Sequence, residues 1–378
     1  MHRGINRTSS PPGDSLAARF DPRHNSLSVM RVSLAVVVAV VHASSIGWQR
    51  QPMLGHTELG QLAVDGFFVV SGFLVTASAL RLPLARYAWH RALRILPGFW
   101  TCLVVVAFGF APFIAWQQGR GPDAILTGEQ SAFHFLTANA LVLMRQWDIG
   151  GLMSARDGGA LDGSLWTLWY EALCYAGLAA LVGAARLLRV QRWCAPVLAT
   201  AVVLAWAVTV AQALGLVGGP AFLPRFVVLF GLGGLGRLLA HRVRFTPRLL
   251  LASFGVLAAS LWLDDYRTVG AVAFAHLMLW TVVALPLRAE PAVDVSYGMY
   301  VYHWPVEQAL FAAGAAAWGV TAFSMVALAL AAGFALASWR FVEAPALSRK
   351  NARWVDRPWE ALVRPGATRP RHRMTTAG

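Results

Sequence analysis

Charged residues are scarce in this sequence, and their scarcity excludes an ordinary soluble domain. Of 378 residues, 13% are charged and 57% are hydrophobic, whereas soluble domains carry about 25% charged residues. Acidic residues are scarcer than basic ones: the chain has 18 aspartates and glutamates and 32 lysines and arginines, which gives a net charge of +14. The composition indicates an integral membrane protein, not a globular protein with a membrane anchor.

Cysteine and lysine are also rare. The three cysteines, Cys102, Cys174 and Cys194, lie in or beside apolar stretches without a CxxC spacing. This pattern argues against a disulfide framework and a metal site, so we expect no bound metal or resident cofactor. Lys350 is the only lysine. The basic residues stand between apolar runs and in both tails, so the positive-inside rule explains them better than nucleic-acid binding does.

The apolar runs predict an all-α, polytopic membrane protein with about ten transmembrane helices. The expected spans are residues 27–48, 59–80, 93–116, 164–186, 195–217, 221–240, 247–263, 268–287, 295–316 and 319–342. Most arginines then fall on one side of the membrane, and the loops of the other side hold most of the acidic residues. An even number of spans places both termini in the cytoplasm.

Three segments follow from these spans. We expect a basic cytoplasmic N-terminal tail over 1–26, a transmembrane domain over 27–343 and a basic cytoplasmic C-terminal tail over 344–378. No cleavage site follows the first apolar run, which is therefore interpreted as a retained helix. The longest outer loop, about 117–163, is polar and contains glycine. It would suit a lid or a docking surface on the outer face.

The first apolar run carries two ionisable residues, Arg31 and His42. Their spacing of eleven residues is about three helical turns, so the side chains share one stripe, roughly 16 Å apart. A polar group inside a membrane marks a candidate functional site. The alternative is an arginine that reaches the interface and a histidine that bonds to a neighbouring helix.

Two carboxylates lie inside other spans. Asp65 belongs to VDGFFVVSGFLV in the second span, and Glu171 ends GSLWTLWYE at the start of the fourth. An unpaired carboxylate is costly in a membrane, so each needs a partner. We expect Asp65, ahead of Glu171, to orient His42, because the two residues lie on consecutive spans at similar depths. Ser71, between them in sequence, most simply serves helix packing.

Two further segments combine polar and apolar residues. The segment HRALRILP contains Arg91 and Arg94, which either follow the positive-inside rule and contact lipid headgroups or bind phosphate. Arg94 lies one turn inside the apolar stretch, deeper than topology requires. The ninth span, with SYGMYVYHWPVEQAL, contains Tyr300 and His303. We interpret His303 as a structural histidine.

Taken together, these pieces resemble the acyltransferase 3 family of bacterial integral-membrane acyltransferases, in the form without a fused esterase-like domain. The matching pieces follow the family's order: the Arg-x10-His of Arg31 and His42, VDGFFVVSGFLV, HRALRILP, GSLWTLWYE, SYGMYVYHWPV and WRFVEAP. The chain departs from the family at His90 and Ala344, where arginine or lysine is common. These departures concern details of the basic cluster.

The resemblance implies an enzyme that transfers an acyl group, usually acetyl, from cytosolic acyl-CoA to a hydroxyl. Typical acceptors are cell-surface or exported glycans such as exopolysaccharide and lipopolysaccharide O-antigen. It implies that His42 is the catalytic histidine, as a general base or as a transient acyl carrier. It also implies that Arg31, Arg91 and Arg94 contact the CoA moiety and that Asp65, Glu171 and His303 lie near the central cavity. We therefore predict a catalytic set of His42, Asp65 and Glu171, and a cavity wall that includes Ser71, Tyr300 and His303.

The sequence is also compatible with other functions. A transporter or flippase for a lipid-linked sugar would also place polar residues inside spans, and the acceptor could instead be a small metabolite such as a macrolide. A polysaccharide polymerase or ligase usually needs a larger outer domain. The expected partners are acyl-CoA, a glycan or lipid-linked glycan acceptor and membrane lipids, without nucleic acid. Homo-oligomerisation stays open, and the expected location is the bacterial inner membrane, with multiple passes.

Overall fold

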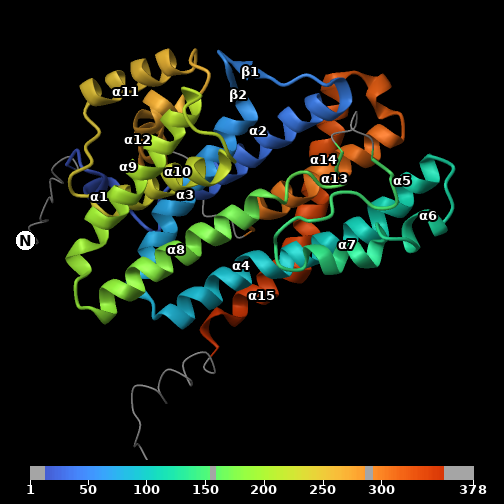
Figure 1. Cartoon of the computed structure of the whole chain (residues 1–378), viewed down its shortest axis with the longest axis horizontal. Helices are drawn as coiled ribbons and strands as arrows, with labels where there is room; N and C mark the ends of the chain where they lie inside the picture. The colour runs from blue at the N-terminus through green and yellow to red at the C-terminus, as the bar shows by residue number, and fades with distance from the viewer. Residues whose placement is uncertain (1–12, 154–158, 286–292, 353–378) are drawn as a thin grey trace, which may run out of the picture.

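The computed structural model describes residues 13–153, 159–285 and 293–352. The expected tail 1–26 lies partly outside these ranges, and so does most of the tail 344–378. The chain is helical almost throughout (Figure 1). Seven of the described helices are long and apolar enough to cross a membrane. The prediction of an all-α, polytopic membrane protein is therefore confirmed.

The long helices correspond one by one to the predicted spans. They are α2 (Leu27–Trp48), α3 (Leu59–Arg81), α4 (Leu84–Val105), α8 (Thr167–Leu187), α9 (Cys194–Ala213), α10 (Phe222–Leu238), α11 (Pro247–Ser260), α12 (Arg267–Ala284), α13 (Ser296–Ala312) and α14 (Val320–Ser338). Three of them, α10, α11 and α13, have 17, 14 and 17 residues. These three are shorter than the roughly 20 residues that a straight span needs.

Two helices are longer than the hydropathy pattern predicts. The third span was expected from residue 93, but α4 begins at Leu84 and continues through a π-helical turn, Val106–Phe110, into α5 (Ala111–Gln117). The basic segment with Arg91 and Arg94 therefore lies on the helix itself and not in a loop. Likewise, α14 continues through a second π-helical turn, Trp339–Glu343, into α15 (Ala344–Ser348).

Close helix packing depends on glycine where α3 crosses α10. A Cβ atom on Gly72 would lie 1.9 Å from the carbonyl oxygen of Phe230, and one on Gly233 would lie 2.0 Å from that of Val69. Small residues let two membrane helices approach this closely. The packing role that the sequence suggested for this part of the second span thus belongs to Gly72.

The remaining elements are short and connect the helices. They are α1 (Leu16–Arg19), α6 (Asp123–Leu126), α7 (Ala132–Asn139) and an antiparallel pair of strands, β1 (Met53–Leu54) and β2 (Thr57–Glu58), in which Met53 pairs with Glu58. The β1–β2 hairpin lies beside α11 in Figure 1. Its turn needs glycine, because Gly55 has φ +64° and packs against the backbone of Leu261.

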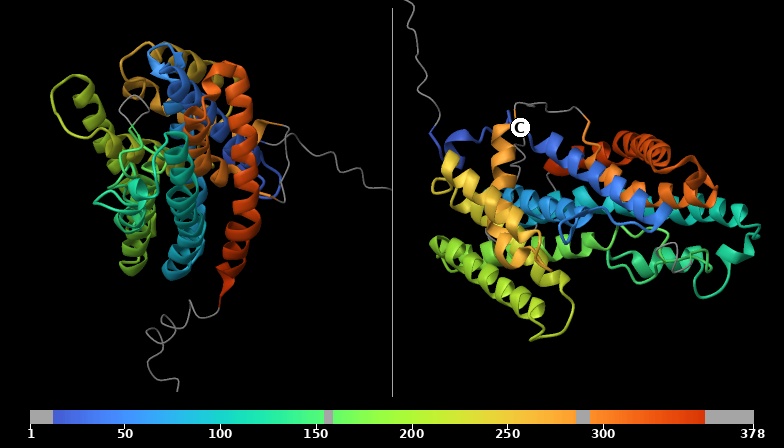
Figure 2. Two further views of the ribbon diagram at one scale, coloured as in Figure 1. Left: turned by 90° about the vertical axis from the view of Figure 1, so that its right-hand side faces the viewer. Right: turned by 90° about the horizontal axis from the view of Figure 1, so that it is seen from above.

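The arrangement of α2, α3, α4, α8 and α13 positions the site. Figure 2 shows that α4, α8 and the C-terminal helix run roughly alongside one another. Both α2 and α13 begin at the same end of the molecule, where Arg31 contacts Asp294. We call this the basic end, and the opposite end, where α2 and α13 finish, the far end.

Candidate active site

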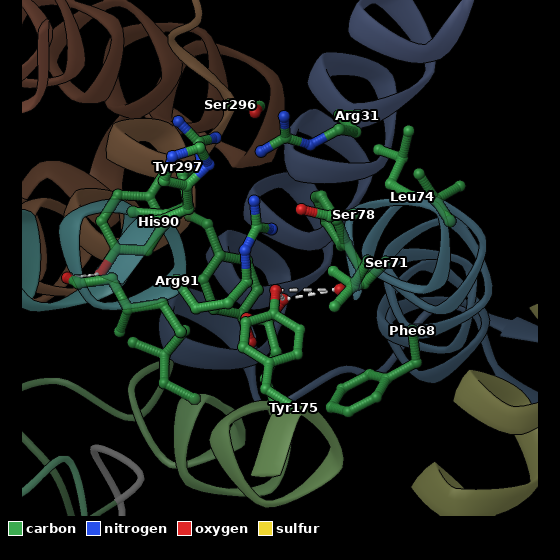
Figure 3. Close-up of a pocket in the computed structure, with 18 of the residues that line it drawn as sticks. Arg31, Phe68, Ser71, Leu74, Ser78, His90, Arg91, Tyr175, Ser296 and Tyr297 are labelled. Carbon is green, nitrogen blue, oxygen red and sulfur yellow. Dashed lines mark hydrogen bonds between the residues drawn. The ribbon is translucent and has the colours of Figure 1, made fainter. Parts of the chain in front are cut away.

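A cavity of about 460 Å³ opens at the basic end and runs between α2, α3, α4, α8 and α13 (Figure 3). Its wall carries the basic residues Arg31, Arg81, His90, Arg91, Arg94 and Lys350. It also carries the polar residues Ser71, Ser78, Thr167, Glu171, Tyr175, Asp294, Ser296, Tyr297 and Tyr300. In Figure 3 the guanidinium groups of Arg31 and Arg91 point into the same space. The cavity therefore combines a strongly cationic mouth with a polar interior.

An acidic residue ties two of the cavity arginines together. Arg31 and Arg94 each donate a hydrogen bond of 2.9 Å to Oδ2 of Asp294. Asp294 also accepts from the backbone and hydroxyl of Ser296, at 3.2 and 2.6 Å. Burial alone would raise the pKa of Asp294, but Arg31 and Arg94 outweigh it and hold that pKa well below its ordinary value. Asp294 thus stays ionised and fixes the two guanidinium groups.

Arg91 is held less tightly than its neighbours. Its guanidinium lies 5.6 Å from the centre of the Tyr175 ring. Its buried Nε atom has no hydrogen-bond partner among the described residues. A guanidinium with an unused donor inside a cavity can still bind an anion, and phosphate oxygens suit it best.

Glu171 lies in the cavity, where it accepts from two hydroxyl groups. Ser71 donates to its Oε1 atom at 3.0 Å, and Tyr175 donates to the same oxygen. The hydroxyls of Ser71 and Tyr175 are also 3.0 Å apart, and Figure 3 marks the hydrogen bonds of Ser71 with dashed lines. Two of the sequence candidates, Ser71 and Glu171, are thereby brought together across α3 and α8.

Two histidines lie beyond Tyr300, at the inner end of the cavity. Tyr300 lines the cavity, and its hydroxyl lies 2.6 Å from Oγ1 of Thr167. Its ring centre is 6.0 Å from that of His303, one turn further along α13. Nδ1 of His42 lies 2.8 Å from Nε2 of His303, with the ring of Trp304 edge-on to His42 at 4.7 Å. The candidate histidine of α2 therefore stands directly behind the cavity.

The hydrogen bonds of His303 fix the proton positions on His42. Nδ1 of His303 lies 3.1 Å from the carbonyl oxygen of Met299, which can only accept, so Nδ1 carries a proton. His303 is fully buried, and its hydrogen-bond partners in the described part of the chain are His42 and the Met299 carbonyl. A buried charge without an acidic partner is costly, so its ring is neutral. Nε2 of His303 then accepts from Nδ1 of His42. This assignment leaves the lone pair on Nε2 of His42, where it can take a proton.

The expected pairing of His42 with Asp65 is wrong. Asp65 is fully buried, but it accepts from Nε of Arg225 at 2.7 Å, Nε of Arg267 at 2.8 Å and the hydroxyl of Tyr266 at 2.8 Å. These residues come from α10 and from α12 and the residue before it, so Asp65 joins three helices. Both of its oxygens are already paired with cations, and His303 occupies the place beside His42 that the sequence analysis gave to a carboxylate.

Several site residues escaped the sequence analysis. Asp294 was not recognised, although an acid beside the ninth span, on the side rich in arginine, was a usable signal. His303 was predicted in the cavity wall but interpreted as structural, because a lone histidine in a span gives no sign of its partner; it lies behind Tyr300 and bonds to His42. Lys350 and Tyr175 also line the cavity, and no local pattern distinguished them.

The C-terminal segment forms part of the mouth. Nε1 of Trp89 donates to the carbonyl oxygen of Arg349, and Nε2 of His90 to that of Lys350, both at 3.1 Å. These bonds place the Lys350 side of the segment against α4. Within the described ranges, no group of three or more His, Cys, Asp or Glu side chains could hold a metal ion.

These features define a class: a multi-pass membrane protein with an internal site in which cationic groups lead to a histidine that can accept a proton. Residues 24–339 match the family model of acyltransferase 3, described as an acyltransferase domain. Because this match covers most of the chain, the protein belongs to the acyltransferase 3 family and is a membrane acyltransferase.

Two curated relatives agree with this placement. The chain is 29% identical over 375 residues to nodulation protein 10 of Rhizobium leguminosarum bv. viciae, covering 87% of this chain and 94% of the relative. It is 27% identical over 312 residues to the O-acetyl transferase of Shigella phage Sf6, covering 76% of this chain and 85% of that protein. No solved structure matches the chain significantly.

Proposed function

We propose that this protein is an O-acetyltransferase of the bacterial inner membrane. In this proposal the donor is cytosolic acetyl-CoA or another acyl-CoA, and the acceptor is a hydroxyl of a cell-surface or exported glycan. The relative from phage Sf6, named an O-acetyl transferase, supports acetyl as the acyl group. The glycan acceptor rests on the resemblance of the chain to its family.

One observation carries the proposal: Tyr300 lines the cationic cavity and its ring lies 6.0 Å from that of His303, the partner of His42. CoA carries several phosphate groups, and arginine and lysine bind phosphate oxygens through charge-assisted hydrogen bonds. Arg31, Arg91, Arg94 and Lys350 surround the mouth, so the nucleotide end of acyl-CoA would lie there. The thioester would then extend past Tyr300 towards His42. With the basic end in the cytoplasm, as the positive-inside rule predicts, the donor enters from the side where CoA is made.

The proton positions on His42 suit acyl transfer. In the proposed step, Nε2 of His42 takes the proton of the acceptor hydroxyl while the hydroxyl oxygen attacks the thioester carbonyl carbon. The C–S bond then breaks, and the departing CoA thiolate recovers the proton from His42. The products are the O-acyl ester and free CoA, and no proton is gained or lost. His303 positions His42 throughout, because it holds the Nδ1 proton of that ring.

Acyl-CoA turnover by the purified protein tests the proposal. The protein, in lipid nanodiscs, is mixed with acetyl-CoA, and free CoA is followed with a thiol reagent while binding is measured by calorimetry. We expect saturable binding and slow release of CoA to water, because water can replace the acceptor hydroxyl. A transporter or flippase for a lipid-linked sugar would neither bind acetyl-CoA saturably nor release CoA, and that result would overturn the proposal.

A further inference from the structure

Glu307 is a buried carboxyl group that nothing in the described structure accounts for. It lies on α13 with no exposed surface. Neither of its side-chain oxygens has a hydrogen-bond partner among the described residues. Buried polar groups are nearly always paired, and an unpaired one costs stability that an apolar side chain of the same size would not. An unpaired buried carboxyl group is therefore a candidate binding group.

The position of Glu307 on α13 connects it to the acyl-transfer path. Ser296, Tyr300, His303 and Glu307 are spaced by four, three and four residues, so they share one face of the helix. Ser296 and Tyr300 line the cavity, and His303 contacts His42. Glu307 continues the same line, about 6 Å further along the axis towards the far end. Glu307 therefore lies beyond the histidine pair on the same face of α13.

The outer loop covers this position. Nε1 of Trp304 and Nε2 of Gln308 both donate to the carbonyl oxygen of Ala160 at 3.0 Å. Gly163 packs so closely that a Cβ atom there would lie 2.5 Å from the Trp304 ring. Residues 160–163 thus hold the outer loop against α13 on both sides of Glu307.

The chemistry around Glu307 selects a neutral ligand. Asp162, also fully buried, belongs to the loop segment that packs against α13 beside Glu307. Its own oxygens are engaged, because Oδ1 accepts from Ser164 at 2.7 Å and Oδ2 from Cys102 at 3.5 Å. Among the described residues no cation is bonded to Glu307, and a buried carboxylate without a paired cation is costly, so the carboxyl group suits its site best in the neutral form. A neutral carboxyl offers one hydrogen-bond donor and one acceptor, which matches a hydroxyl group.

We propose that Glu307 is a positioning residue for the acceptor and that it selects polyols, by bonding a hydroxyl next to the one that receives the acyl group. This inference rests on the proposed function, which supplies the reaction and the donor. It adds that the acceptor lies on the face of α13 that carries His303, on the far-end side of the histidine pair. It also adds that the acceptor must present at least two neighbouring hydroxyl groups.

The test compares two small acceptors in the purified full-length protein with acetyl-CoA as donor. Methyl α-D-glucopyranoside supplies neighbouring hydroxyls, and 1-propanol supplies one. The variants are Glu307→Met, which removes both hydrogen-bonding functions at similar volume, and Glu307→Gln, which keeps a donor and an acceptor. Glu129→Met, on the exposed surface of the outer loop, is the control. Free CoA and acetylated product are measured, together with the melting temperature.

We expect Glu307→Met to lower kcat/KM for the glucoside at least tenfold, while the KM for acetyl-CoA and the rate with 1-propanol change less than twofold. Glu307→Gln should retain most of the activity with the glucoside. The melting temperature of Glu307→Met should rise, because a buried unpaired polar group has been removed. A purely structural role cannot combine higher stability with a loss restricted to one acceptor.

Two results would overturn the inference in different ways. If the wild-type protein transfers acetyl to the glucoside and Glu307→Met does so with unchanged kcat/KM, Glu307 does not position the acceptor, and the proposed function stands. If the wild-type protein neither binds acetyl-CoA nor releases CoA, the proposed function itself fails, and the inference fails with it.

Discussion

Nδ1 of His42 lies 2.8 Å from Nε2 of His303, so two histidines that are 261 residues apart in the chain form a hydrogen-bonded pair, of which His303 is fully buried. His303 in turn donates from Nδ1 to the carbonyl oxygen of Met299. The carbonyl oxygen can only accept a hydrogen bond, so Nδ1 of His303 carries a proton and Nε2 of His303 accepts the proton of Nδ1 of His42. His42 thereby presents an unprotonated nitrogen without needing a carboxylate.

Changing His303 should slow catalysis without removing the donor site. In His303→Gln the side-chain amide oxygen can still accept from Nδ1 of His42, whereas His303→Ala leaves that proton without a partner. We expect kcat to fall modestly in His303→Gln and by about a hundredfold or more in His303→Ala, within the range of general-base contributions. Steady-state kinetics with acetyl-CoA check this, and the KM for acetyl-CoA should stay nearly constant. Equal kcat in all three proteins would show that His303 does not position His42.

The cavity arginines should govern affinity for the donor. Arg91→Ala removes a guanidinium that has an unused donor in the cavity, so its effect should be mainly on binding. A charge-assisted hydrogen bond is worth about 1.5–3 kcal/mol, which corresponds to roughly a tenfold to hundredfold rise in the KM for acyl-CoA. Arg94→Ala should behave similarly, with some loss of stability because it also releases Asp294.

Arg86 supplies the control for this experiment. It lies on α4 with the other two arginines but does not line the cavity within the described structure. Arg86→Ala should leave the KM for acyl-CoA within about twofold of the wild-type value. A change in acceptor kinetics alone after Arg91→Ala would contradict the assignment of this arginine to CoA.

We predict that Asp65 stabilises the folded protein and takes no part in catalysis. Its carboxylate holds Arg225 and Arg267 inside the protein, and removing one partner of a buried ion pair typically costs about 3–5 kcal/mol. Asp65→Asn should therefore lower the melting temperature strongly, while the folded fraction still binds acetyl-CoA. Asp265→Asn is the matched control, since Asp265 also contacts Arg267 but is partly exposed. A stable Asp65→Asn protein that lacks transfer would restore the catalytic role first expected.

Asp162 should make stability depend on pH. Burial raises the pKa of Asp162 from its ordinary 3.8 to about 7, even though hydrogen bonds from Ser164 and Cys102 favour the charged form. A raised pKa means that the folded protein binds this proton more tightly than the unfolded chain. The contribution of Asp162 to stability is then greatest below about pH 4 and declines as the pH rises to about 7.

The difference between wild type and Asp162→Asn isolates this contribution. Asparagine keeps the acceptor for Ser164 but does not titrate. Melting temperatures measured in detergent from pH 4 to 8 should fall more steeply for the wild type than for the variant, and the two curves should run parallel above pH 7. Parallel curves over the whole range would show that Asp162 does not titrate in this window.

Much of the fold was readable in the sequence, because each membrane helix needs its own apolar run. All ten expected spans are helices, and Arg31, Arg91, Arg94, Ser71, Glu171 and Tyr300 line one cavity. The start of α4 was misplaced by nine residues, since its first turns alternate basic and apolar residues and fall outside a hydropathy window. A hydropathy pattern detects the lipid-facing length of a helix, not the length of the helix.

The partners of buried polar groups could not be read in the same way. Asp65 is bonded to residues 160 and 202 positions away, and helical periodicity says nothing about which helices meet. The rule that consecutive helices are neighbours correctly placed α2 beside α3. The same rule did not predict which side chains pair. Each helix packs against several others, and a carboxylate such as Asp65 pairs with arginine in preference to a neutral histidine.

The catalytic role of His42 is tested most directly by measuring acetyl transfer by purified His42→Ala in parallel with its binding of acetyl-CoA. His42 stands behind the cavity and not among the arginines, so its removal should not disturb the donor. For His42→Ala we predict that acetyl-CoA binds within a few-fold of the wild-type affinity, that membrane insertion and melting temperature are normal, and that no transfer is detected. His42→Gln should give the same results. Acetylated product formed by either variant at the wild-type rate would contradict the central claim that His42 carries the reaction.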